Sequence, residues 1–165
     1  MLTPMRHPRR IPDAPLALAA ALLLATGACS PSDEELAANE AAALEVVEQF
    51  GQRLRLVSVG TIPPADLGRR LTEAYGPYVT TLLLGGWISD PASAPGREGS
   101  SPWPARIEVR ELRSVGGTGF DFDADVIYVT GVDENEPPAF REPVTLRVVR
   151  GPDDVWRISE WTQRG

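Results

Sequence analysis

The stretch that decides the fold is Phe120-Asp121-Phe122-Asp123-Ala124-Asp125-Val126, in which apolar and acidic residues alternate. Side chains of a β-strand point alternately to its two faces, so this pattern predicts a strand with one apolar and one acidic face. Three further segments alternate in the same way, at residues 106–110, 144–148 and 156–159. Strands that each carry one polar face are typical of an antiparallel sheet covered on one side. The segments 116–119 and 151–154 contain glycine and are predicted turns between the strands.

The chain before these strands has the period of an α-helix. Ser32-Asp33-Glu34-Glu35 forms a capping box and places acidic side chains in the first helical turn. Apolar residues then recur on one helical face, at Leu36, Ala43, Val47, Phe50, Leu54 and Val57. They predict a long helix that ends before Gly60. Pro63-Pro64 begins a second, shorter helix that ends at Gly76-Pro77, and a third short helix is predicted over residues 78–87.

Helices followed by strands are typical of the α+β class, in which the helices cover the apolar face of the sheet. We expect a single domain over residues 35–162, which is a usual size for one hydrophobic core. The Pro-, Gly- and Ser-rich segment 89–104 connects the helices to the sheet. Within it we expect Ala94–Pro104 to be an ordered crossing, with Trp103 inserted at the edge of the sheet. Arg97 would bond local carbonyls or a carboxylate, or else lie free at the surface.

A long helix, two short helices and a meander that closes on a strand such as Val155-Trp156-Arg157-Ile158 resembles the NTF2-like, or cystatin-like, cone. The segments Ala94–Arg97 (APGR) and Ser100–Glu108 (SSPWPARIE) resemble secreted or lipid-anchored proteins of Gram-positive bacteria. The resemblance extends loosely over residues 44–162. It implies an NTF2-like α+β cone, with a long N-terminal helix and two short helices packed on a curved antiparallel sheet of about four or more strands. It also implies a location outside the cytoplasm, and it implies no activity.

Residues 1–28 are typical of an export signal. Arg6, Arg9 and Arg10 precede Leu16–Ala28, a run of 13 residues without a charge. A helix of that length spans about 20 Å, less than the hydrocarbon core of about 30 Å, so the run is too short for a membrane anchor.

Cys29 follows Thr26-Gly27-Ala28, and this sequence resembles the lipobox of bacterial lipoproteins, in which the cysteine becomes the lipidated first residue. We therefore predict a signal peptide of the lipoprotein type over 1–28, a lipid such as palmitate on Cys29, and a lipidated N-terminus and tether over 29–34. The protein would contact the membrane through that lipid and lie on the extracytoplasmic side, in the cell envelope. The same residues also fit an ordinary signal peptide cleaved near Ala28.

Composition excludes several kinds of site. The 165 residues include one His, His7, and one Cys, Cys29, so nothing after Cys29 supplies imidazole or thiolate. That part therefore holds no Ser-His-Asp or Cys-His nucleophile and no zinc site of the Cys/His type. Without the leader's three Arg and one Asp, 13 basic and 22 acidic residues remain, a net charge of −9. This balance argues against binding nucleic acid, whose phosphates need a basic surface.

The three aspartates Asp121, Asp123 and Asp125 have the spacing of a calcium loop. Positions six and twelve of such a loop need Gly and Glu, and Val126 and Val132 stand there. We therefore predict neither a metal site nor a cofactor, and we expect the aspartates to form a solvated ladder with Arg on adjacent strands. The expected partners are Arg106, Arg110 and Arg147. A weak surface cation site is the alternative.

Six aromatic residues fall on faces expected to point inward: Tyr75, Tyr78, Trp87, Phe122, Tyr128 and Trp156. They fill a core, or they line the pocket that the resemblance implies between sheet and helices. The sequence contains no convincing acid/base pair, so it favours a non-enzymatic binding or accessory module. Such a module would present the mouth of the cone, or the acidic segment 131–143, to a small ligand or an envelope protein. The alternative is an isomerase, dehydratase or hydrolase that uses Tyr128 with Glu111 or Glu160.

Overall fold

The computed structural model describes residues 32–60, 62–131 and 137–164. The helical part comprises α1 (Asp33–Arg53), the 3₁₀ turn η1 (Leu54–Leu56), α2 (Pro64–Tyr75), α3 (Thr81–Ser89) and the 3₁₀ turn η2 (Pro91–Ser93). The strands are β1 (Trp103–Val115), β2 (Gly119–Val129), β3 (Phe140–Arg150) and β4 (Trp156–Gln163). They form one antiparallel sheet in the order β1-β2-β3-β4. Among the residues that the structure describes, no helix is long and apolar enough to cross a membrane.

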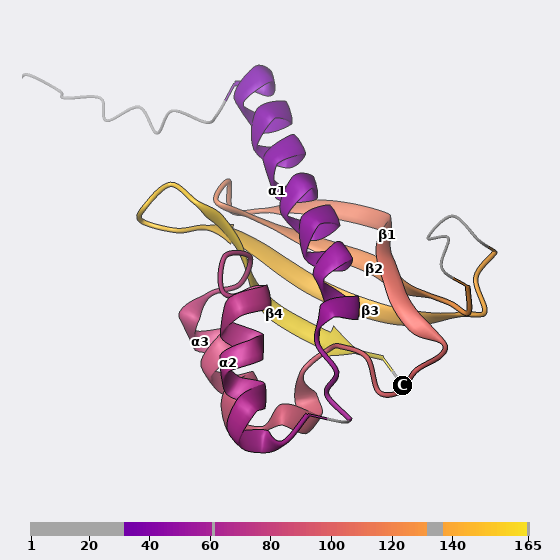
Figure 1. The fold of residues 1–165 in the computed structure, drawn as a ribbon. Helices are drawn as coiled ribbons and strands as arrows, with labels where there is room; N and C mark the ends of the chain where they lie inside the picture. The colour runs from indigo at the N-terminus through magenta and orange to yellow at the C-terminus, as the bar shows by residue number, and fades with distance from the viewer. Residues whose placement is uncertain (1–31, 61, 132–136, 165) are drawn as a thin grey trace, which may run out of the picture.

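The arrangement is the α+β architecture that the sequence led us to expect, with a long helix and two short helices packed on a curved antiparallel sheet. Figure 1 shows α1 crossing one face of a curved sheet, with α2 and α3 packed beside it. The expected class, helix order and sheet type are therefore confirmed. The secondary structure starts at Asp33 and ends at Gln163, so it begins two residues before and ends one residue after the predicted domain limits.

The capping box fixes the start of α1 as predicted. The Glu35 backbone N–H donates to Ser32 Oγ at 3.2 Å, and the Ser32 N–H donates to the Glu35 carboxylate at 2.9 Å. Asp33 and Glu34 therefore belong to the first helical turn rather than to the tether expected over 29–34. Cys29 lies outside the described residues.

The apolar face of α1 forms the centre of the core. Five of the predicted residues are at most 1% exposed: Ala43, Val47, Phe50, Leu54 and Val57. Gly51 lies where the helix meets β1, and a Cβ there would stand 2.8 Å from the Ile107 backbone N. Glycine thus allows the close approach of α1 to the sheet.

The third helix begins at Thr81 and not at Tyr78, because the Thr80 hydroxyl caps it by accepting from the Leu83 N–H at 3.4 Å. The two residues before Thr80 pair with β4 instead. The Ile158 N–H donates to the Tyr78 carbonyl at 2.8 Å, and the Thr80 N–H donates to the Ile158 carbonyl at 2.9 Å. This pairing attaches the helical part to the last strand.

The crossing from the helices to β1 is held by buried hydrogen bonds. Tyr75 Oη donates to the Pro95 carbonyl, and the Arg97 N–H donates to the Val57 carbonyl, both at 2.8 Å. The Arg97 guanidinium donates to Ser58 Oγ at 3.0 Å, so its partner is a hydroxyl rather than the expected carbonyl or carboxylate. Trp103 begins β1 at the edge of the sheet, as expected. There it packs half-buried in a small second cluster with Ala105, Ile127 and Val129.

Two of the three register shifts in the sheet change which face the C-terminal ends of β1 and β4 present. Val109 pairs with Ala124 and Glu111 with Asp123, so Arg110 is an extra residue in β1. Arg147 pairs with Glu160 and Val148 with Ile158, so Ser159 is an extra residue in β4. A bulge of one residue reverses the alternation beyond it. The residues after each bulge therefore point to the face opposite to the one that strict alternation predicts.

Candidate binding site

The interior of the cone is filled by aromatic side chains. Phe50 lies 5.0 Å from Tyr75, 6.1 Å from Trp87 and 5.7 Å from Trp161, between ring centroids. Tyr75 and Trp87 are themselves 5.9 Å apart. These rings occupy the space between α1 and the sheet.

The aromatic residues predicted from the sequence separate into two groups. Tyr75, Trp87, Phe122 and Trp156 are buried core residues, and Trp156 lies 5.5 Å from Phe120. Burial raises the pKa of Tyr75, whose hydroxyl stays protonated and donates to a backbone carbonyl. Tyr78 and Tyr128 are only partly buried, and each lines a separate surface hollow.

A hollow of about 460 Å³ lies beside the paired residues Tyr128 of β2 and Phe140 of β3. It is lined by Glu98, Gly99, Ser101, Pro102, Tyr128, Phe140, Arg141, Glu142, Pro143 and Arg164. Tyr128 lies opposite Phe140 and Glu142 opposite Val126, on neighbouring strands β2 and β3. Because Val126 belongs to the core, the Tyr128, Phe140 and Glu142 side chains extend from the inner face of the sheet.

Tyr128 and Glu142 form the central contact of this hollow. Tyr128 Oη donates to Glu142 Oε2 at 2.8 Å, and the Tyr128 ring stacks on Phe140 with centroids 4.2 Å apart and planes at 13°. Burial and, after it, the Glu142 carboxylate raise the pKa of Tyr128. The phenol therefore keeps its proton near neutral pH and holds the carboxylate in place.

Two arginines at the rim are oriented by acidic residues of the sheet. Arg141 Nη1 lies 2.6 Å from Glu108 Oε2, and Arg164 Nη2 lies 2.5 Å from Asp123 Oδ1. The hydrogen bond from Arg141 is the main reason that the pKa of Glu108 is lowered. The hollow thus combines a stacked aromatic pair, a bound carboxylate and fixed cations.

Glu111 and Glu160, the carboxylates predicted to join Tyr128, are not near it. Their side chains are 57% and 62% exposed on the outer face of the sheet, where they contact Arg113 and Arg147. The bulges at Arg110 and Ser159 cause this difference, since each moves the following glutamate away from the inner face. The carboxylate that the structure brings to Tyr128 is Glu142.

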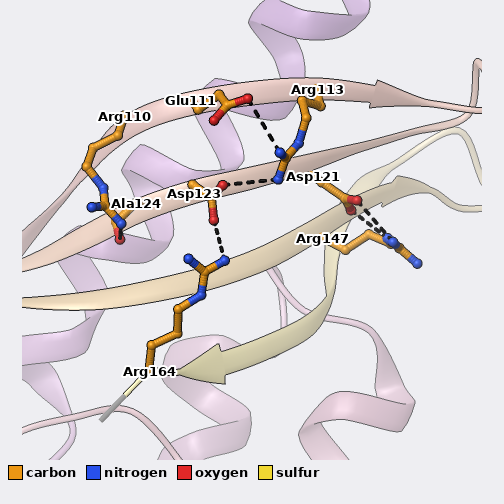
Figure 2. A network of polar contacts seen from close by, with 8 residues as sticks. All are labelled: Arg110, Glu111, Arg113, Asp121, Asp123, Ala124, Arg147 and Arg164. Atoms are coloured by element: carbon orange, nitrogen blue, oxygen red, sulfur yellow. Dashed lines mark hydrogen bonds and ion pairs between the residues drawn. The ribbon is translucent and has the colours of Figure 1, made fainter.

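The three aspartates of β2 form the ladder with arginines on the outer face. Figure 2 shows two of them, Asp121 and Asp123, with their arginine partners. Asp121 Oδ1 accepts from Arg147 Nε at 2.7 Å, and this hydrogen bond is the main cause of the lowered pKa of Asp121. Asp123 lies between Arg113, at 3.0 Å, and Arg164.

Asp125 completes the ladder on the outer face. It lies 3.5 Å from Arg110. Of the predicted partners, Arg106 pairs instead with Glu108, at 2.7 Å. The sequence did not single out three of these arginines. Arg113 follows the bulge in β1, Arg164 lies just beyond the end of β4, and Arg141 lies in β3 ahead of the strand predicted over residues 144–148.

Comparison with known proteins yields few relatives. No protein-family model matches the chain, and no curated protein matches it. One solved structure, described as an "Ntf2 like protein involved in plasmid conjugation", is similar with a TM-score of 0.41 and 10% sequence identity. The similarity covers 78% of this chain and 49% of that one, so this chain spans about half the length of its structural neighbour.

Proposed function

We propose that the protein is a lipid-anchored binding or accessory module of the cell envelope, without catalytic activity, that takes a small ligand at the Tyr128 hollow. The observation that carries this proposal is the contrast between the interior, which is filled by aromatic rings, and the open hollow beside Tyr128. Phe50, Tyr75, Trp87 and Trp161 occupy the interior. A volume of about 460 Å³ beside Tyr128 falls within the range of about 300–1,000 Å³ typical of small-molecule sites.

The lining of the hollow favours a small, partly planar ligand with polar groups. Phe140 is 47% exposed and offers a ring face already stacked on Tyr128. Pro102 and Pro143 add rigid apolar surface, and Arg141 supplies a fixed cation at the rim. Planar groups stack on aromatic faces, while a few placed polar groups orient them.

Binding fits the chemistry of Tyr128 better than catalysis does. Its proton is already donated to Glu142, and its raised pKa disfavours the phenolate that a general base would need. The close Tyr128–Glu142 pair nevertheless favours one second candidate, proton transfer of the isomerase or dehydratase type. If the wild-type protein turned over a substrate and Tyr128→Phe did not, the function would be this proton transfer rather than binding.

Fragment screening tests the proposed site. The wild-type protein, Phe140→Ser and the control Val155→Ser would be screened by saturation-transfer NMR against one library of small aromatic and heterocyclic acids and amides. Val155 is an exposed apolar residue outside the hollow, so it matches the change in chemistry. We expect Phe140→Ser to weaken the hits roughly three- to tenfold, as the loss of one stacked ring predicts, and Val155→Ser to leave them unchanged. Hits that bind Phe140→Ser as well as they bind the wild type would refute the site.

The lipid anchor is a separate part of the proposal and has its own test. Cys29 precedes the helix cap at Ser32 by two intervening residues, so an anchor there would hold the domain close to the membrane. Mass spectrometry of the N-terminus from the membrane fraction should find a lipidated Cys29, and Cys29→Ala should release the protein. An unmodified start elsewhere, in a protein that is fully soluble, would contradict the anchor.

A further inference from the structure

Two more hollows meet at Leu56, where the 3₁₀ turn η1 follows α1. The first has a volume of about 420 Å³ and is lined by Arg53, Leu56, Arg70, Glu73, Ala74, Pro77 and Tyr78. The second has a volume of about 300 Å³ and is lined by Arg55, Leu56, Arg97 and Trp103. Leu56 is 54% exposed and forms the ridge between them. We call the two hollows together the Leu56 groove.

The Leu56 groove is basic in a protein that is otherwise acidic. Four arginines line it, and Glu73 is the one carboxylate among the described lining residues. Glu73 is already bound, since Arg69 Nη1 lies 3.0 Å from its Oε1. The chain as a whole has a net charge of −7, so this surface is a local reversal of sign.

Three arginines of the groove, Arg53, Arg70 and Arg97, differ from those of the sheet, which are paired with carboxylates. Arg53 donates from Nε and Nη2 to the Tyr78 hydroxyl at 3.2 and 3.1 Å, and its Cζ lies 5.6 Å from the centre of that ring. Arg70 is exposed and has no hydrogen-bond or ion-pair partner among the described residues. Arg97 Nε is buried and has no partner there either, although its Nη2 bonds Ser58. Three guanidinium groups of the groove thus lack a carboxylate partner among the described residues.

We propose that the Leu56 groove binds an acidic segment of a partner protein, with carboxylates on Arg53, Arg70 and Arg97 and an apolar side chain against Leu56 and Trp103. A guanidinium group forms paired, charge-assisted hydrogen bonds with carboxylates, and these are stronger than neutral ones. Two hollows that share one apolar ridge fit an extended ligand, because a single small anion fills only one of them. Charge complementarity therefore selects an acidic peptide over a basic or neutral one.

The Leu56 groove is independent of the Tyr128 hollow, although the two are neighbours. Arg97 and Trp103 line the groove, whereas Glu98, Gly99, Ser101 and Pro102 between them line the Tyr128 hollow. The segment 98–102 separates the two sites. A failure of one binding proposal leaves the other intact.

Selection from a random peptide library tests the groove. The protein would be purified in mild detergent from the cells that make it and presented to a 12-residue phage library. A second selection would use the double variant Leu56→Ser/Arg70→Gln. Both positions are exposed, so the fold should persist, and a thermal melt checks this. The control Leu82→Ser/Arg150→Gln makes the same chemical changes at exposed residues outside the groove.

We expect the wild type and the control to enrich peptides that combine several Asp or Glu residues with an apolar residue. Fluorescence anisotropy with the best such peptide should show a loss of affinity of at least about tenfold in Leu56→Ser/Arg70→Gln, and a change within about twofold in the control. The affinity should also fall as salt is added, because exposed charges are screened.

Four results would overturn the proposal. The first is the absence of enrichment on the wild type, and the second is equal enrichment on Leu56→Ser/Arg70→Gln. The third is displacement of the peptide by acetate or inorganic phosphate at millimolar concentration, which would indicate a simple anion site. The fourth is self-association of the wild type, and not of the double variant, in sedimentation experiments, because the occupant would then be a second copy of this chain.

Discussion

Replacing Phe50 by Ala tests whether the aromatic cluster inside the cone holds the fold together. Phe50 is 0% exposed. Among the described residues, its ring is the one that packs against the rings of all three of Tyr75, Trp87 and Trp161. Truncation removes the apolar area of a whole ring and leaves a cavity between rigid neighbours. Substitutions of this type cost about 3–5 kcal/mol, out of a total stability of about 5–15 kcal/mol for a domain of this size.

Urea unfolding, followed by circular dichroism and by tryptophan fluorescence, measures the loss. With an m-value of about 2 kcal/mol/M, a loss of about 4 kcal/mol moves the midpoint down by about 2 M. The m-value should not change, because the same surface is exposed on unfolding. Both probes should report the same midpoint if the helices and the sheet share one core.

Asp123→Asn is the comparison that makes this experiment decisive. Asp123 pairs with Arg113 and Arg164 on the partly exposed outer face, where an ion pair contributes about 0–1 kcal/mol. Asparagine retains the shape of the side chain, so the loss should stay below about 1 kcal/mol. If Asp123→Asn proved more destabilising than Phe50→Ala, the assignment of inner and outer faces would be inverted.

Three further predictions follow from the same structure. In urea unfolding, Trp161→Ala should lower the free energy of unfolding by about 3 kcal/mol or more and Glu160→Ala by less than about 1 kcal/mol, because the bulge at Ser159 turns Trp161 inward. Equal losses of stability in the two variants would contradict the bulge. The hydrogen bond from Arg157 lowers the pKa of Asp153 to about 2. The ionised Asp153 therefore stabilises the folded state above about pH 4, which is the pKa of an Asp in the unfolded chain, and this stabilisation is lost as the pH falls toward 2. An NMR titration should show that pKa rising toward about 4 in Arg157→Gln, and an unchanged value would exclude the contact in solution. Ser32→Ala removes the helix cap and should lower the free energy of unfolding by about 1 kcal/mol in the same assay. If the substitution left the stability unchanged, Ser32 would not be the N-cap of α1.

Local patterns were sufficient to predict the elements of the fold. The capping box at Ser32 and the alternation from Phe120 to Val126 each depend on neighbours in the sequence, and the structure contains both. Helical spacing also identified the residues that are buried along α1 and the turn after it, from Ala43 to Val57. These features are decided by backbone geometry and burial within one element, which the sequence displays directly.

The site could not be predicted because it depends on the register between strands. A bulge adds one residue to a strand and leaves no mark in the sequence. The alternation of Ile107 and Val109 therefore predicts Glu111 on the inner face, whereas the structure has it on the outer face. The bulge at Ser159 acts in the same way in β4, where alternation predicts Glu160 on the inner face and the structure has Trp161 packed against the core. Pairing with the neighbouring strand, and not the sequence of either strand, decides these positions.

Glu142 was missed for a different reason. The inner face of β3 continues from Val144 back to Glu142 and Phe140, so the alternation was present. Pro143 interrupts it, and proline is rare within a central strand because it donates no hydrogen bond. Pro143 nevertheless lies within β3, near the start of that strand, where it pairs with Asp125 of β2. Continuing the alternation past that proline would have found the carboxylate that accepts the bond from Tyr128.

The proposed anchor and the Leu56 groove lie at opposite ends of α1, and this separation bears on the kind of partner. Ser32, three residues beyond Cys29, caps one end of the helix, and Leu56 follows the other end. A helix of 21 residues is about 31 Å long, several times the Debye length of about 8 Å at physiological salt. If Cys29 carries the proposed lipid and α1 points away from the membrane, the arginines of the groove would gain little from anionic lipid. In that arrangement the groove would be open to a partner on the side away from the membrane, and the proposed acidic protein segment meets that condition while lipid headgroups near Cys29 would not.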